Sequence, residues 1–448
     1  MSKPQSQPGR IDTLTPEEEL KLKQVWAHLF HSWGIPVDSS KVLTHSNASI
    51  RRSDSVSSSH SHATTASKKS SGGKLFGRFR KSSKHEKKEP TGQHHTRHSR
   101  TSSVTSTRSR ESIEAMYNPN MIHEALKGLK PEEIRSNLWE MLRTDYPDNL
   151  ILRFLRARKW DTDKTLSMLS NSLHWRLKES HPDEIIKRGE LGAYQDGKAG
   201  LVKNIELRKA VIHGYDKAGH PLVYIRPRKH FSSDQTEQEL ELYSLLIIEQ
   251  ARLFLREPTD AATILFDLQG FTMSNMDYAP VKYLISCFEA HYPECLGKLF
   301  IHKAPWIFPP IWNIIKNWLD PVVASKIVFT KSAKDLAKYI PDEYIPKSLG
   351  GECTYDYDNY SKPDGSLDTK LDKKDELEVV MEERHSIVEK FIQATVSWIE
   401  AGDKETSAKF LDAKIELSKE LTRNYVKLDP YIRSRSFYDY EGTLKIEE

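Results

Sequence analysis

Short apolar runs that alternate with helical segments constrain the fold of this chain most strongly. A first strand and a turn at Asp216–Gly219 precede the first of these runs. The runs that indicate buried strands are Pro221–Ile225, Thr263–Asp267, Leu299–His302 and Ile327–Thr330. The helical patterns between them cover about residues 238–255, 278–291 and 310–319. Strands that alternate with helices are typical of a largely parallel sheet, so the sequence predicts an α/β domain.

Helical patterns also lie on both sides of this region. Residues 14–33 predict an amphipathic helix that Thr15 caps and whose first turn contains Pro16. Its apolar face is too large to stand alone, so we expect it to dock on the main body. Helical signals continue from about residue 124 to 175, and a charged helical tail is expected from about 375 to 425.

A serine-rich basic stretch separates the first helix from the rest. Residues 51–110 hold 16 serines and 15 Lys or Arg against 3 Asp or Glu, which makes this stretch +12 in a chain whose total is only +4. The remainder therefore carries about −8. Such a composition predicts disorder. The run Lys74–Lys81 places apolar residues among basic ones, which suits either contact with anionic membrane or a solvated linker.

These shifts predict five regions, with boundaries that follow composition and pattern. They are an N-terminal helical segment (1–38), a disordered basic linker (39–112), a helical subdomain (113–186), an α/β ligand-binding domain (187–358), and a charged loop with a helical tail (359–448). The three cysteines, without metal-like spacing, indicate a reducing cytosolic compartment. We find neither a secretory signal nor a run of 18 apolar residues, so any membrane contact is expected to be peripheral.

Catalytic and nucleotide-binding motifs are absent from the sequence. The nearest match, Gly192–Ala199, has the glycine and lysine spacing of a P-loop but ends in alanine and follows a polar segment. The histidines at 94, 95 and 98 lie in the serine-rich stretch, and we do not expect them to bind a metal. The sequence therefore predicts a protein that is not an enzyme and uses no cofactor other than a bound ligand.

One arginine stands out in the segment Leu150–Trp160. On a continuous helix, Arg158 falls on the apolar face of Ile151, Phe154 and Leu155, whereas the arginines at 153 and 156 fall opposite and can be solvated. An inward arginine is unfavourable unless it meets an anion. Arg158 is therefore either an anion ligand or an arginine at a frayed helix end.

The same segment resembles the N-terminal signature of CRAL-TRIO lipid-binding proteins. Further matching motifs occur in family order over about residues 122–358: Thr263–Gly270, Tyr292–Glu294, Leu299–Pro305, Leu319–Val322 with Ser325–Lys326, and Ile340–Gly351. The chain is most similar to the fungal phosphatidylinositol transfer proteins of the Sec-fourteen type, and its extra helices resemble the non-classical members of that group. The resemblance implies a mixed, largely parallel sheet, flanked by helices around an apolar lipid cavity that a movable helix closes.

The resemblance also implies a ligand site. By their place in the family motifs, Arg158, Glu294 and Lys326 are expected to bind the inositol phosphate headgroup. The gate corresponds to the aromatic helix near residue 312. The aromatic residues expected at the gate, or in contact with membrane, are Trp306, Phe308, Trp312 and Trp318.

Three departures from the family pattern refine the expected ligand. Val323 stands where a threonine usually lies beside the headgroup. Ala262 and Phe288 stand where family members that bind phosphatidylcholine have small hydroxyl residues. We therefore expect phosphatidylinositol binding and transfer without phosphatidylcholine transfer. The alternatives are a carrier of a neutral apolar ligand such as a sterol or squalene, and a lipid-regulated scaffold.

The remaining expectations concern the setting of the protein. We expect a cytoplasmic monomer that contacts endosomal or endoplasmic-reticulum-derived membranes transiently and supports phosphoinositide signalling and membrane trafficking. A phosphoinositide kinase is a candidate partner by resemblance, and no nucleic acid is expected.

Overall fold

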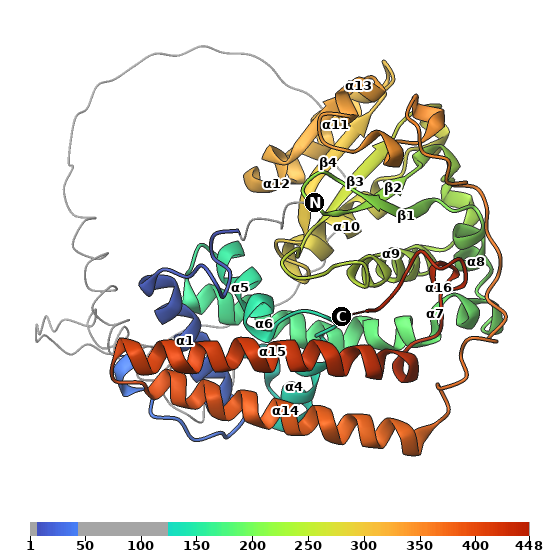
Figure 1. Cartoon of the computed structure of the whole chain (residues 1–448). Helices are drawn as coiled ribbons and strands as arrows, with labels where there is room; N and C mark the ends of the chain where they lie inside the picture. Colours follow the sequence, from blue (N-terminus) through green and yellow to red (C-terminus); the bar gives the residue numbers. More distant parts are fainter. Residues whose placement is uncertain (1–6, 44–123, 448) are drawn as a thin grey trace, which may run out of the picture. The chain divides into compact units, whose positions relative to one another are not determined.

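A computed structural model describes residues 7–43 and 124–447 of the 448-residue chain (Figure 1). The described residues on both sides of the gap, apart from Leu43, belong to one compact unit. The predicted disordered linker begins too early, because residues 40–43 are helical and Val42 is buried in a hydrophobic core. The other predictions for the basic linker, including its run 74–81 and its histidine cluster, lie outside the described residues.

The centre of the fold is a five-stranded sheet in the order β1-β2-β3-β4-β5. Only the β1–β2 pair is antiparallel, so the predicted mixed, largely parallel sheet is confirmed. The strands are β1 (Ala210–Tyr215), β2 (Pro221–Ile225), β3 (Ala262–Asp267), β4 (Leu296–His302) and β5 (Ile327–Thr330). Their nearly continuous apolar runs suit strands that are covered on both faces.

The strand register sorts the side chains into two layers. On one face, Tyr224, Leu265, Phe300 and Val328 align and pack against α13 (Ala333–Leu336) and the turns that follow it. On the other face, the neighbouring row of Val223, Ile264, Leu299 and Ile327 lies toward the longer helices. Strand periodicity thus gives the sheet two apolar faces.

The helices that precede the first strand, and those that connect the later strands, flank the sheet. They are α7 (Pro182–Gln195), α8 (Ala199–Glu206), α9 (Glu237–Arg252), α10 (Tyr278–Ala290), α11 (Phe308–Ile315) and α12 (Pro321–Ser325). The segment Gly192–Ala199 lies at the end of α7 and the start of α8 rather than after a strand, which agrees with its rejection as a P-loop. The expected aromatic helix ends earlier than predicted, because residues Lys316–Trp318 form a 3-10 turn.

A second core joins the two ends of the chain. It contains residues from α1 (Pro16–Ser32), α4 (Pro131–Glu140), α5 (Pro147–Ala157), α6 (Thr162–Trp175), α14 (Lys374–Glu400) and α15 (Lys404–Ile432). The prediction that α1 docks on the body is confirmed, since Trp26 and Phe30 are fully buried there. Thr15 caps α1 in a capping box, as expected.

The C-terminal tail differs from the single helix that was predicted. Figure 1 shows α14 and α15 side by side as an antiparallel hairpin. The helix breaks at Ala401, which has an extended ψ of 127°, and Asp403 then caps α15 by accepting from the backbone amide of Thr406. The helical periodicity of the two segments hid this short turn.

Candidate functional site

Arg158 lies at the C-terminal cap of α5, where the helix has already ended. Its guanidinium donates to the carbonyls of Glu289, at 3.3 Å, and Ala157, at 3.3 Å. Within the part of the chain that the structure describes, it forms no ion pair with a carboxylate. Carbonyl oxygens hold this half-buried cation, and one of them lies at the end of α10. The positive charge of Arg158 is therefore available to an anionic ligand.

The prediction that the arginines at 153 and 156 are solvated is wrong. Arg153 is 3% exposed, and its guanidinium lies 2.6 Å from the carboxylate of Asp145. Arg156 lies 3.1 Å from Asp260. The periodic pattern of α5 failed here because Asp145, just before the helix, and Asp260, from a distant segment, meet the side of the helix that was assigned to solvent.

Glu294 and Lys326 form the second half of the site. Glu294 follows α10 with a left-handed φ of 58°, and its carboxylate lies 4.0 Å from the Lys326 ammonium. Lys326 follows α12 and donates to the carbonyl of Leu296 at 2.7 Å. Both side chains are about one quarter exposed, at 28% and 27%. The pair therefore remains open to a ligand.

The three predicted headgroup residues all meet one segment, the turn between α10 and β4. Arg158 contacts Glu289 at its start, Glu294 lies within it, and Lys326 contacts Leu296 at its end. The structure therefore places two cations and one carboxylate from distant parts of the sequence along one segment, from Glu289 to Leu296. Such cations can bind a phosphate, and a carboxylate can accept hydrogen bonds from hydroxyl groups.

An incompletely covered apolar surface lies on the sheet face next to these residues. The three positions at which the sequence departs from the family pattern, Ala262, Phe288 and Val323, are all half-buried against the same hydrophobic cluster, as are Phe266 and Leu299. The departures thus enlarge one apolar surface and supply no hydroxyl group to it.

The four predicted gate residues have different environments. Trp306 is 90% exposed, whereas Phe308 is buried and packs edge-on against Phe271. The Trp312 ring lies 5.3 Å from that of Phe329, and the Trp318 ring lies 5.5 Å from that of Tyr278. Only Trp306 is freely available at the surface in this conformation.

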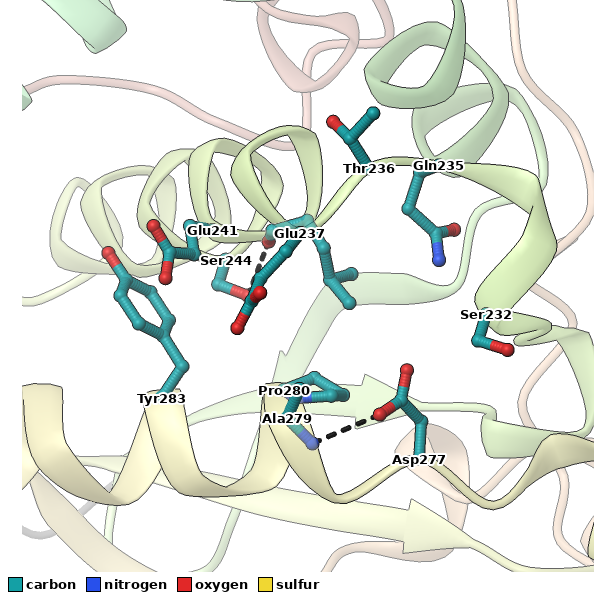
Figure 2. A pocket seen from close by; sticks show the side chains of 11 residues that line it. Ser232, Gln235, Thr236, Glu237, Glu241, Ser244, Asp277, Ala279, Pro280 and Tyr283 are labelled. Atoms are coloured by element: carbon teal, nitrogen blue, oxygen red, sulfur yellow. Dashed lines mark hydrogen bonds between the residues drawn. The ribbon is translucent and has the colours of Figure 1, made fainter. Parts of the chain in front are cut away.

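A pocket of about 220 Å³ lies between the N-terminal ends of α9 and α10 (Figure 2). Carboxylates and hydroxyls line much of it, among them Glu237, Glu241, Ser244 and Asp277. Burial and the neighbouring Glu237 raise the pKa of Glu241. The pocket is smaller than the roughly 300–1,000 Å³ of ordinary ligand sites, so it cannot enclose a diacyl lipid. None of the predicted site residues lines it.

Sequence reasoning missed a buried ionic network between α9 and the segment that precedes α5. Glu249, which is fully buried, accepts hydrogen bonds from Arg143, Arg252 and the Tyr292 hydroxyl at 2.8–3.2 Å. Burial raises the pKa of Glu249, but the arginines lower it much further, so the net shift is strongly downward. The sequence signal for this network was the presence of Glu249 and Arg252 in the largely apolar second half of α9.

Two further findings concern only residues 7–43 and 124–447. No helix there is long and apolar enough to cross a membrane. No group of three or more His, Cys, Asp or Glu residues there is arranged to hold a metal ion.

Known proteins with similar sequences show the family to which this fold belongs. The CRAL/TRIO domain matches residues 205–351, and the CRAL/TRIO N-terminal domain matches residues 120–171. The chain is 55% identical to "Phosphatidylinositol transfer protein CSR1" of Eremothecium gossypii, over 98% of this chain and 99% of that protein. It is 35% identical to "CRAL-TRIO domain-containing protein C3H8.02" of Schizosaccharomyces pombe, over 97% of this chain and 92% of that protein.

Among solved structures, the chain is similar to Sfh5, with a TM-score of 0.40 and 18% identity over 54% of this chain and 80% of that one. The fold and the cluster of cations beside an apolar sheet face define a ligand-binding protein of α/β class. The sequence relatives, matched over nearly their whole length, identify the group: the chain belongs to the CRAL-TRIO family.

Proposed function

We propose that the protein binds phosphatidylinositol and transfers it between membranes. The observation that carries this proposal is the pairing of Arg158, a cation without a carboxylate partner among the described residues, with the open Glu294–Lys326 pair across one turn. Arg158 and Lys326 meet the lipid phosphate, and Glu294 accepts hydrogen bonds from inositol hydroxyls. The name of the 55% identical relative supports the same ligand.

The acyl chains lie on the half-buried apolar face of the sheet, under α10 and the segment that follows it. A diacyl lipid has roughly 30 methylenes, each worth about 0.8 kcal/mol on burial, so free passage through water is prohibitive. A protein that covers the chains removes this barrier. Because the pocket in Figure 2 is too small for them, α11 and α12 must move outward to admit the lipid.

Membrane contact is assigned to the surface around α11 and β5. Within the described part of the chain, five of the nine exposed large hydrophobic residues lie between positions 273 and 329: Met273, Trp306, Ile314, Val322 and Phe329. An exposed apolar group of this kind suits insertion at a lipid interface. Trp306 meets the membrane first, whereas Phe308, Trp312 and Trp318 become exposed only when the gate moves.

Phosphatidylcholine is excluded from this proposal. The hydroxyl residues expected for its headgroup are replaced by Ala262 and Phe288, both of which pack in the apolar cluster. A choline phosphate placed against that surface would lose its hydration without gaining hydrogen bonds.

Mass spectrometry of lipid bound to the purified protein tests the function. We expect phosphatidylinositol in the wild type and its loss in the double variant Arg158→Ala/Lys326→Ala. Arg188→Ala removes an exposed arginine that pairs with Asp196 far along the sequence from this site, and it should retain the lipid. Phosphatidylinositol retained by the double variant would contradict the assignment of the headgroup site.

A neutral apolar ligand such as squalene is the second candidate. It is favoured by the apolar replacements at positions 262, 288 and 323, which lie in one cluster. Squalene bound equally by the wild type and the double variant would select this candidate, because squalene has no group for Arg158 and Lys326 to recognise.

The cellular role follows from the lipid. A monomer that takes up phosphatidylinositol at endosomal or endoplasmic-reticulum-derived membranes, and works from the cytoplasm, would supply a phosphoinositide kinase with substrate. It would thereby support signalling and membrane trafficking. Fractionation of cells that contain the wild type or Trp306→Ala tests the membrane association.

A further inference from the structure

The backbone that carries Arg158 adopts an unusual conformation. Helix α5 ends in a Schellman motif, in which the amide of Trp160 donates to the carbonyl of Leu155 and the amide of Lys159 donates to that of Arg156. Lys159 and Trp160 have left-handed φ values of 53° and 62°. Glycine normally occupies the first of these positions, and a residue with a Cβ atom is strained in this conformation. Surrounding structure must therefore hold the turn in place.

The chain before α1 packs directly against this turn. The carbonyl of Gly9 accepts a hydrogen bond from the Arg156 guanidinium at 2.8 Å. A Cβ atom built on Gly9 would lie 3.1 Å from Arg156 Cδ and 3.1 Å from Trp160 Cζ2, and its φ is +75°. Gly9 thus contacts the residues that lie two positions before and two positions after Arg158.

Arg10 anchors this contact. Its side chain is 1% exposed, lies 2.7 Å from Asp260 and also pairs with Glu257. The amide of Ile11 donates to the Asn149 side chain at 3.0 Å, which ties the same segment to the first turn of α5. A buried arginine with two carboxylate partners is a strong anchor, because removal of one partner leaves buried charge uncompensated.

Asp260 connects the anchor to α5 as well. The same carboxylate oxygen accepts from Arg10 at 2.7 Å and from Arg156 at 3.1 Å. Gly9 and Asp260, the carboxylate that Arg10 also binds, therefore hold Arg156, and the carbonyl of Arg156 accepts one of the two hydrogen bonds of the Schellman turn.

We propose that the Gly9–Arg10 turn is a positioning element of the headgroup site: it clamps the left-handed turn at Lys159–Trp160 and so fixes Arg158 toward the lipid phosphate. This inference rests on the proposed function. It assigns to the N-terminal extension a part in ligand recognition, although the extension itself does not touch the ligand.

Uptake of phosphatidylinositol from phosphatidylcholine vesicles by the full-length protein tests the proposal. Arg10→Ala should weaken uptake about tenfold, the size expected when a hydrogen bond to a charged group is lost. Arg10→Lys should restore part of it. The decisive variant adds Lys159→Gly to Arg10→Ala. Glycine accepts the left-handed conformation without the clamp, so uptake should return toward the wild-type value.

Arg433 provides a matched control. It is also 1% exposed and pairs with two carboxylates, Asp429 and Asp439, at 2.7 Å each. Arg433→Ala should lower stability without the tenfold loss of uptake, and Lys159→Gly should not change uptake in that background. If Arg10→Ala does not fold, Gly9→Ala carries the same test, since its Cβ pushes the turn off Arg156 and Trp160.

The outcomes separate the two proposals. Uptake that is unchanged in Arg10→Ala, or lost but not recovered by Lys159→Gly, overturns the positioning role while the proposed function stands. Wild-type protein that takes up no phosphatidylinositol, or Arg158→Ala with unchanged uptake, overturns the proposed function and the positioning role with it.

Discussion

The ammonium of Lys414 lies 2.8 Å from the carboxylate of Asp148, and both side chains are almost wholly buried. The same carboxylate oxygen accepts from the Trp26 indole at 2.7 Å, and Lys414 lies 3.9 Å from the centre of the Trp398 ring. This contact joins α15 to α5, α1 and α14. Both ends of the chain are thus tied to the helix that presents Arg158.

The Lys414 contact predicts a dependence of stability on pH. Burial lowers the pKa of Lys414 from 10.5 to about 8, against the influence of Asp148. The unfolded state therefore binds this proton more tightly than the folded state does. The resulting loss of unfolding free energy is fully present below pH 8 and disappears as the pH rises from 8 to 10.5. Relative to Lys414→Met, the wild type should gain about 3 kcal/mol in unfolding free energy across this window. Urea titrations at several pH values measure the difference, and a constant difference would contradict the shifted pKa.

The buried network between α9 and the segment that precedes α5 predicts a large loss of stability. Glu249→Gln keeps the shape of the side chain but leaves the buried guanidinium groups of Arg143 and Arg252 without their shared carboxylate. The free energy of unfolding should fall by about 3–5 kcal/mol. Urea unfolding measures it. Glu382→Gln, an exposed acid on α14, should have little effect, and equal effects of the two variants would show that the network is not stabilising.

The exposed indole of Trp306 predicts a defect in transfer rather than in lipid binding. Trp306→Ala removes apolar area that a membrane would cover, so transfer between vesicles should slow about tenfold. The lipid content and thermal stability should stay unchanged, because the side chain is 90% exposed. Val379→Ala removes an exposed side chain from α14 and should transfer normally. Equal transfer rates for the two variants would contradict a role of Trp306 in membrane contact.

The missing hydroxyl at position 323 predicts a gain of affinity. Val323→Thr should strengthen phosphatidylinositol binding about threefold, the effect of one added neutral hydrogen bond. Val379→Thr, on α14 and 66% exposed, is the matched control and should change nothing. Competition between phosphatidylinositol and a fluorescent lipid measures both. A loss of affinity in Val323→Thr would show that this position contacts acyl chain instead.

The sequence by itself determined the sheet and the start of the first helix. Apolar runs such as Thr263–Asp267 predict strands because a strand covered on both faces needs apolar residues throughout. The capping box at Thr15 predicts the start of α1 because its hydrogen bonds are local. Arg158, Glu294 and Lys326 were found through the order of motifs, and the structure brings all three to one turn.

The tertiary structure alone decided which arginines of α5 are buried and what positions them. Periodicity assigned Arg153 to solvent, but Asp145, in the loop directly before α5, and Asp260, from a distant segment, meet it there. The contact of Gly9 with Arg156 and Trp160 likewise joins residues about 150 positions apart. Local patterns record the preferences of neighbouring residues, whereas the partner of a buried charge is set by packing between distant segments.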